Sequence, residues 1–229
     1  MTTFVLVPGA WLGGWAWKKV VPLLVEKGHE VHSVTLTGMG ERVHLASEDV
    51  GVETAIQDVL NVIKFTDLND FVLVGHSFAG KVVAAVADRA PERVRMLLYL
   101  DAFRPQKVRT PQGGGDPNEF VKLGPTEWKI PFTEGILDSF GKDVQGADRE
   151  WILSKATPWP KRQVTDSVRL SENFDSVKKA YILCTGGGDN VEEVLKEKLD
   201  GPVKVIESGH WPMITKPIEL VDALLSLAK

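Results

Sequence analysis

The sequence predicts an α/β protein in which a mostly parallel sheet is flanked by helices and interrupted by one inserted segment. Short apolar runs alternate with stretches of helical periodicity, which is the pattern of repeated βαβ units. This alternation stops after residue 103 and resumes near residue 176. The length of 229 residues also fits one domain with a sizeable insertion better than two equal halves. We therefore assign residues 1–103 and 176–229 to a core and residues 104–175 to an insertion.

The amino-terminal half carries the clearest strand and helix patterns. Residues 4–7 form a short apolar run that Pro8 ends, which is typical of a strand buried on both faces. Residues 15–27 repeat apolar side chains at helical spacing, and Gly28 follows them as a C-cap would. By the same criteria we expect further strands at residues 29–36, 71–74 and 94–100, and further helices at residues 54–65 and 79–89.

The insertion differs from the core in composition. It is rich in proline, glycine and polar residues, contains Trp128, Trp151 and Trp159, and has a helical stretch at residues 148–155. The α/β pattern then resumes, with strands expected at residues 180–184 and 203–206 and helices at residues 191–199 and 218–228.

The charge balance and the apolar content limit the classes of partner. Lysine and arginine total 27 and aspartate and glutamate total 31, a net charge of −4, which gives no support for a nucleic-acid or anionic-membrane partner. No apolar run approaches the roughly 18 residues of a membrane span. The single cysteine, Cys184, cannot form an intramolecular disulfide, so we expect a reducing, cytoplasmic location.

The most informative motif is the stretch Gly75-His76-Ser77-Phe78-Ala79-Gly80, a G-x-S-x-A-G variant of the G-x-S-x-G motif, with the second glycine at Gly80. It lies between a predicted buried strand and a predicted helix of small residues, the context of a nucleophile elbow. Glycines allow strand and helix to approach closely there, and the serine hydroxyl stands exposed above the end of the strand. We therefore predict Ser77 as a nucleophile.

A serine needs a base, and the chain has five histidines. His210 is the best candidate, because it follows the last predicted strand in a loop, where α/β sheets place their sites. The third member should be a carboxylate after a strand that lies between serine and histidine in the chain. Asp189 is favoured because it follows residues 180–184 and a flexible glycine run, and Asp101, directly after residues 94–100, is a competing position.

The same architecture predicts where an oxyanion would be stabilised. The backbone amide of Phe78 lies at the start of the helix that follows the serine, where the helix dipole is positive. The second donor should come from the loop after the first strand, and the amide of Ala10 is the natural candidate.

With these features the chain resembles the α/β-hydrolases, and within them the group of plant methyl-ester esterases, hydroxynitrile lyases and related bacterial esterases. The matching segments run nearly from end to end in the expected order: residues 4–7, 13–15, 75–80, 99–103 and 209–217. The resemblance implies an α/β-hydrolase fold with residues 104–175 as a helical cap. It also implies Ser77, Asp189 and His210 as the triad and the amides of Ala10 and Phe78 as the oxyanion hole.

Departures from the family pattern bear on the substrate. The family usually has histidine before Gly9 and at position 12, and this chain has Pro8 and Leu12. The lyase branch has threonine in place of Gly9 and lysine in place of Trp211, which counts against cyanohydrin cleavage because tryptophan cannot carry the charge that stabilises departing cyanide. The residues expected in the substrate pocket are Gly9, Leu12, Trp128 and Trp211.

Taken together, the sequence predicts a serine carboxylesterase that cleaves a small, largely apolar ester through an acyl-enzyme and needs no metal or organic cofactor. Two alternatives stay open: a hydroxynitrile-lyase-like enzyme, and a ligand-binding protein with a slow or relict triad. The expected partner is a small-molecule ester rather than a nucleic acid or a membrane, and a homodimer is left open as the assembly.

Overall fold

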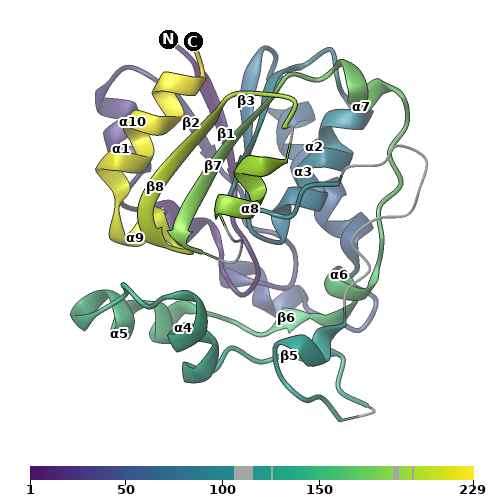
Figure 1. The fold of residues 1–229 in the computed structure, drawn as a ribbon. Coiled ribbons are helices and arrows are strands. Elements are labelled where there is room, and N and C mark those ends of the chain that lie inside the picture. Colours follow the sequence, from purple (N-terminus) through teal and green to yellow (C-terminus); the bar gives the residue numbers. More distant parts are fainter. Residues whose placement is uncertain (106–115, 125, 188–190, 198) are drawn as a thin grey trace.

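The core of the molecule is one parallel β-sheet of six strands. The computed structural model describes residues 1–105, 116–124, 126–187, 191–197 and 199–229. The strand order is β2-β1-β3-β4-β7-β8, and every neighbouring pair is parallel (Figure 1). The strands are β1 Thr3–Val7, β2 Glu30–Ser33, β3 Phe71–His76, β4 Val94–Leu100, β7 Lys179–Gly186 and β8 Val203–Gly209. The predicted α/β class and mostly parallel sheet are confirmed.

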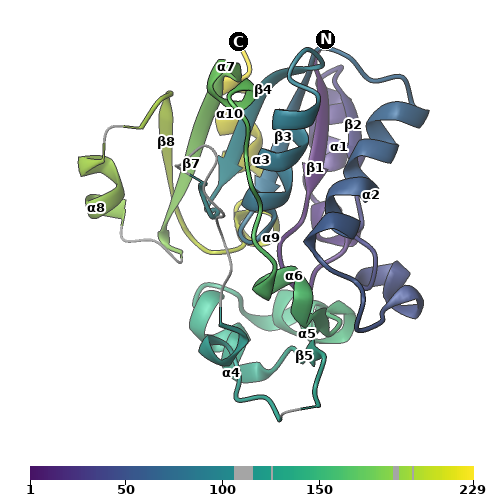
Figure 2. The same ribbon diagram turned by 90° about the vertical axis from the view of Figure 1, so that its right-hand side faces the viewer.

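Helices cover both faces of this sheet (Figure 2). Successive residues of a strand point to opposite faces, so β1 contributes Val5 to one core and Phe4 to the other. The first core lies under α2 Val52–Phe65, α3 Ala79–Arg89 and α7 Asn173–Ser176, and the second lies under α1 Val21–Glu26, α9 Pro212–Thr215 and α10 Pro217–Leu227. α8 Val191–Lys196 follows β7.

The single helix predicted at residues 15–27 is wrong. Residues 15–27 form a 3-10 helix, η1 Gly14–Trp17, followed by the separate helix α1. Pro22 explains the break, because proline has no amide hydrogen and is tolerated only in the first turn of a helix, where it lies here. A 3-10 helix η2, Gly40–Leu45, and α9 were not expected. In the part of the chain that the structure describes, no helix has both the length and the apolar character needed to cross a bilayer.

The inserted segment lies across the carboxyl ends of the strands, the lower layer of Figure 1. Its elements are η3 Pro117–Glu119, β5 Lys129–Ile130, α4 Glu134–Phe140, α5 Gly146–Lys155, β6 Trp159–Pro160 and α6 Lys161–Thr165, and β5 pairs antiparallel with β6. Buried polar contacts tie it to the core. The Trp11 indole donates to the Ile130 carbonyl at 3.1 Å, and the Lys81 ammonium donates to the Val164 carbonyl at 2.9 Å.

Candidate active site

Ser77 stands on a tight turn between β3 and α3. Its φ of +56° is left-handed, a strained conformation for a residue with a side chain and a frequent feature of functional sites. The two motif glycines allow this turn. A Cβ on Gly75 would lie 2.3 Å from Val83 Cγ2, and a Cβ on Gly80 would lie 2.0 Å from the Phe103 carbonyl oxygen. The close approach of strand, helix and following loop therefore requires both glycines.

His210 contacts the serine and a carboxylate at the same time. Its Nε2 lies 2.7 Å from Ser77 Oγ, and its Nδ1 lies 2.5 Å from Asp101 Oδ2. His210 follows β8, and its amide donates to the Phe140 carbonyl of the insertion at 3.0 Å, so both layers of the molecule hold the base in place. A serine, an imidazole and a buried carboxylate in this sequence of contacts is the arrangement that activates a serine for nucleophilic attack.

The carboxylate at His210 is Asp101, the competing candidate, in place of the favoured Asp189. Residue 189 lies outside the described residues. Asp101 reaches the histidine because it follows β4 directly and leaves the strand with a left-handed φ of +43°. Chain order could not separate the two positions, since both lie between the serine and the histidine. The glycine run counted in favour of Asp189 in the sequence, whereas in the structure Gly187 lies against the Asp101 carboxylate.

His76 supports the site from beneath, a role that sequence reasoning missed. The Gly9 amide donates to its Nδ1 at 3.2 Å, so Nδ1 is an acceptor and Nε2 carries the proton. Nε2 then donates to the His210 carbonyl at 2.8 Å. Burial, and after it the neighbouring His210, lower the pKa of His76 to about 3, so His76 is neutral at physiological pH. It ties the first loop to the loop of the base.

The space in front of Ser77 is a cavity of about 280 Å³ with a largely aromatic wall. Trp211, expected there, lines it beside His210. The aromatic lining, apart from the histidines, consists of Trp11, Phe78, Phe103, Phe120, Phe140, Trp159 and Trp211. Trp11 and Trp159 meet edge to face with ring centroids 5.3 Å apart, and Trp159 also packs on Phe78 at 4.8 Å. These mutual contacts fix the shape of the wall.

Three other residues expected in the pocket lie elsewhere. Leu12 is fully buried in the second core, because the chain turns inward after Trp11. Trp128 is half-buried beside β5 and stacks under Lys129, whose ammonium lies 5.3 Å from its ring. Gly9 is buried behind the catalytic residues, where a Cβ would lie 2.8 Å from both His76 Nδ1 and Ser77 Cβ. Gly9 therefore sets the spacing of the site rather than its lining.

Ala10 and Phe78 both line the pocket next to Ser77. Ala10 comes from the loop after β1, and Phe78 immediately precedes α3. The two residues that were expected to offer amides to an oxyanion thus flank the serine from opposite loops.

Other chemistries find less support near the site. Burial raises the pKa of the Cys184 thiol, and the Asp101 carboxylate raises it further, so Cys184 is not a thiolate nucleophile. Among the described residues there is no group of three histidine, cysteine, aspartate or glutamate side chains that could hold a metal ion.

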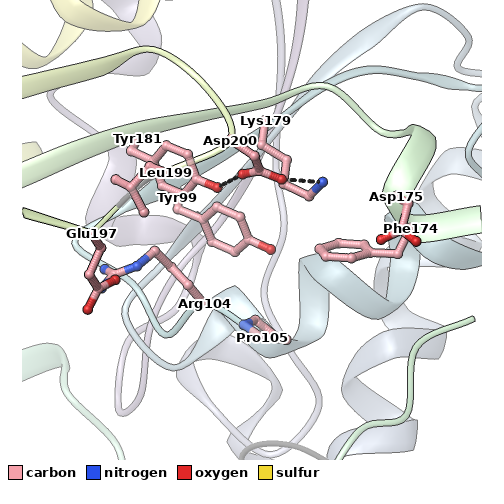
Figure 3. Close-up of a pocket in the computed structure, with 10 residues that line it drawn as sticks. All are labelled: Tyr99, Arg104, Pro105, Phe174, Asp175, Lys179, Tyr181, Glu197, Leu199 and Asp200. Carbon is pink, nitrogen blue, oxygen red and sulfur yellow. Dashed lines mark hydrogen bonds and ion pairs between the residues drawn. The ribbon is translucent and has the colours of Figure 1, made fainter. Parts of the chain in front are cut away.

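A second and larger cavity, of about 520 Å³, lies between β4, β7 and α7 (Figure 3). Its floor is the stacked pair Tyr99 and Tyr181, with ring centroids 5.5 Å apart. The Tyr181 hydroxyl donates to Asp200, which also accepts from Lys179 at 2.8 Å. This cavity shares no lining residue with the cavity in front of Ser77, and none of its lining residues is arranged as an activated nucleophile.

The fold and the triad together define a serine hydrolase site on an α/β sheet. Comparison with known proteins agrees: the model of the alpha/beta hydrolase family matches residues 4–223, and the chain belongs to this family. The chain is 33% identical to a carbendazim hydrolyzing esterase of Nocardioides sp. (strain SG-4G), over 99% of this chain and 100% of that protein. It is 26% identical to methylesterase 9 of Arabidopsis thaliana, over 100% and 98% of the two chains.

A solved structure shares the fold. An extracellular alpha/beta-hydrolase from a Paenibacillus species superposes with a TM-score of 0.86 at 23% identity, over 99% of each chain. The family model and the two esterase relatives confirm the resemblance to the esterase group of the α/β-hydrolases that the residues predicted.

Proposed function

We propose that the protein hydrolyses a small, largely apolar carboxylic ester by way of an acyl-enzyme on Ser77. The observation that carries this proposal is the unbroken set of contacts from Asp101 through His210 to Ser77, which opens into an aromatic cavity. The chain is a carboxylic ester hydrolase by its relatives, which are named as a carbendazim hydrolyzing esterase and a methylesterase.

Each step of this reaction has a residue in position. His210 Nε2 takes the proton of the Ser77 hydroxyl as the oxygen attacks the ester carbonyl, and later gives that proton to the departing alcohol. Asp101 holds the imidazole in the required tautomer and stabilises its positive charge. The amides of Ala10 and Phe78 bind the oxyanion of the tetrahedral intermediate. Water activated by His210 then releases the acid.

The cavity sets the size and polarity of the substrate. A volume of about 280 Å³ is at the low end for small-molecule sites, and its wall is mainly tryptophan and phenylalanine. An ester with a compact, apolar or aromatic acyl group fits such a pocket. The insertion forms the outer wall through Phe120, Phe140 and Trp159, so we assign it the role of a cap.

The two alternatives are weaker. A lyase of this group needs threonine at position 9, yet any Cβ there meets His76 and Ser77 at 2.8 Å. A cation would also be needed at position 211, where the chain has tryptophan. A binding protein does not need the Ser77–His210 contact of 2.7 Å, which serves proton transfer. We also propose a cytoplasmic location, supported by the single, buried Cys184, and leave a homodimer open as the assembly.

The direct test is hydrolysis of p-nitrophenyl acetate and butyrate by the wild type and by Ser77→Ala. Ser139→Ala, an exposed serine on the insertion, is the matched control. We expect turnover in the wild type and the control and none in Ser77→Ala, with a fluorophosphonate adduct on Ser77 located by mass spectrometry. A folded wild type that neither turns over these esters nor forms the adduct would point to the binding-protein alternative.

A further inference from the structure

The end of β7 lies directly against the triad acid. The Asp101 amide donates to the Ile182 carbonyl of β7 at 2.8 Å, which continues the pairing of β4 with β7. The Cys184 amide donates to Asp101 Oδ1 at 3.2 Å, and Oδ2 faces His210 Nδ1. The carboxylate that orients the base thus belongs to the residue after β4 and accepts a hydrogen bond from the neighbouring strand β7.

Gly187, just beyond the end of β7, lies against the Asp101 carboxylate. A Cβ on this residue would lie 2.0 Å from Asp101 Oδ2 and 2.6 Å from Asp101 Cγ. The φ of Gly187 is not left-handed, so its backbone would accept an L side chain. The carboxylate of Asp101 alone excludes one.

This overlap means that either residue could deliver an oxygen to His210. In an aspartate, a carboxylate oxygen lies about 2.4 Å from its own Cβ. A Cβ at position 187 starts 2.0 Å from the present Oδ2 position. An aspartate at 187 could therefore place an oxygen within hydrogen-bond distance of His210 Nδ1, provided that the side chain of Asp101 were absent.

We propose that Gly187 is the positioning residue that decides which strand supplies the triad acid. The space beside His210 Nδ1 that the Asp101 carboxylate now fills, here called the slot, has room for one carboxylate, from residue 101 or from residue 187. Because residue 187 is glycine, Asp101 supplies it in this protein. The inference rests on the proposed hydrolase mechanism, in which a carboxylate orients His210. It makes the position of the acid transferable between two neighbouring strands without a change in the rest of the site.

Four variants test the transfer: Asp101→Gly, Gly187→Asp, the two combined, and Asp101→Gly with Gly187→Asn. The assays are kcat and KM for p-nitrophenyl acetate across pH, and the rate at which fluorophosphonate labels Ser77. We expect Asp101→Gly to lose about a thousandfold or more in kcat, by analogy with triads that lose the acid. The combined aspartate variant should regain at least about a hundredfold, with the pH dependence of the wild type.

The asparagine version is the matched control, because an amide fills the slot without the charge that stabilises imidazolium. It should regain little activity and should not restore the pH profile. Gly187→Asp alone should lose activity, because two carboxylates then compete for one slot. A combined aspartate variant that folds with the melting temperature of Asp101→Gly yet is no faster overturns the proposal.

A milder variant covers the case in which the combined one fails to fold. Gly187→Ala should displace Asp101 and lower kcat about tenfold or more with little change in KM, because it misorients the base without touching the pocket. Gly135→Ala is the control, since a Cβ there meets only Thr133 Oγ1 at 3.7 Å. Full kcat in Gly187→Ala rejects the proposal. A wild type that is inactive and unlabelled instead rejects the hydrolase function itself.

Discussion

The two cavities near the end of β4 differ in size, polarity and use. The larger, about 520 Å³, is built on Tyr99 and contains the ion pair of Lys179 and Asp200. The smaller, about 280 Å³, adjoins Asp101, directly after the end of β4, and is walled by aromatic rings. Only the smaller one has a nucleophile, a base and an acid in contact. Volume alone would therefore select the wrong cavity, and the chemistry of the side chains selects the right one.

The polar groups of the two cavities also differ in how deeply they are buried. In the larger cavity, the Lys179 ammonium has a carboxylate partner whose side chain is 59% exposed, so the pair stands at the rim. In the smaller one, the hydrogen bond of His210 to Asp101 is buried, and the hydrogen bond of His210 to the reacting oxygen of Ser77 is partly buried. Burial strengthens such electrostatic contacts, and for that reason substitutions in the two cavities should differ greatly in their effect on activity.

The largest expected difference concerns the nucleophile and the base. We expect Ser77→Ala and His210→Ala each to lower kcat by about a millionfold, and the double variant to be no slower than either, because the two residues act as a unit. Tyr181→Phe in the larger cavity should keep kcat within about twofold, since it lies outside the catalytic contacts. Steady-state kinetics with one p-nitrophenyl ester checks all four proteins.

A double variant whose loss is the product of the single losses would mean that serine and histidine work independently. A large loss in Tyr181→Phe would mean that the second cavity takes part in catalysis. Either result would break the distinction between the two cavities.

Sequence patterns predicted the serine and the histidine of the catalytic cavity, because both residues sit at fixed points of the fold. Ser77 lies between two glycines whose spacing a tight turn requires, and His210 follows the last strand of the sheet. The strands were also recognisable, since residues buried on both faces form short apolar runs. These features are local, and local features can be read along a chain.

The identity of the acid could not be predicted in the same way. Whether Asp101 or Asp189 meets His210 depends on how β4 and β7 end relative to each other, which is a property of three-dimensional register. The role of His76 depends on hydrogen bonds to residues 67 and 134 positions away in the chain. The composition of the pocket wall likewise depends on how the insertion folds back, so Leu12 and Trp128 were placed there wrongly.

A pH experiment sharpens the comparison, because the catalytic cavity contains the buried neutral His76, whereas the larger cavity contains the ion pair of Lys179 and Asp200. The pKa of His76 is lowered to about 3 by burial and by the neighbouring His210, against 6.5 when unfolded. Between pH 6.5 and about pH 3 the His76 imidazole is therefore protonated in the unfolded state and neutral in the folded state. The stability that this residue contributes above pH 6.5 is lost as the pH falls through this range. Between pH 6.5 and pH 5 the loss from this residue should be about 2 kcal/mol.

Urea unfolding at pH 7.5 and pH 5.0 measures this loss. His76→Gln should be less stable at pH 7.5, because two buried hydrogen bonds are disturbed, yet its stability should fall less on acidification than that of the wild type. His44→Gln, an exposed histidine, is the control and should follow the wild type at both pH values. An equal fall in His76→Gln and the wild type would show that His76 does not carry the proton linkage.

The smallest expected effect separates the two tyrosines on the floor of the larger cavity. The Tyr181 hydroxyl donates to the Asp200 carboxylate, whereas the buried Tyr99 hydroxyl has no hydrogen-bond partner among the described residues. Tyr181→Phe should therefore lower the free energy of unfolding by about 0.5 to 1.5 kcal/mol, the range for an ordinary hydrogen bond, because the Asp200 side chain is 59% exposed and water screens its charge. Tyr99→Phe removes a buried hydroxyl without a partner and keeps the stacked ring, so we expect no loss and a gain of up to about 1 kcal/mol. Urea unfolding of both variants at pH 7.5 gives the comparison. If Tyr99→Phe is the more damaging of the two, the Tyr99 hydroxyl is bonded in solution, and the larger cavity is more polar and better solvated than its side chains indicate.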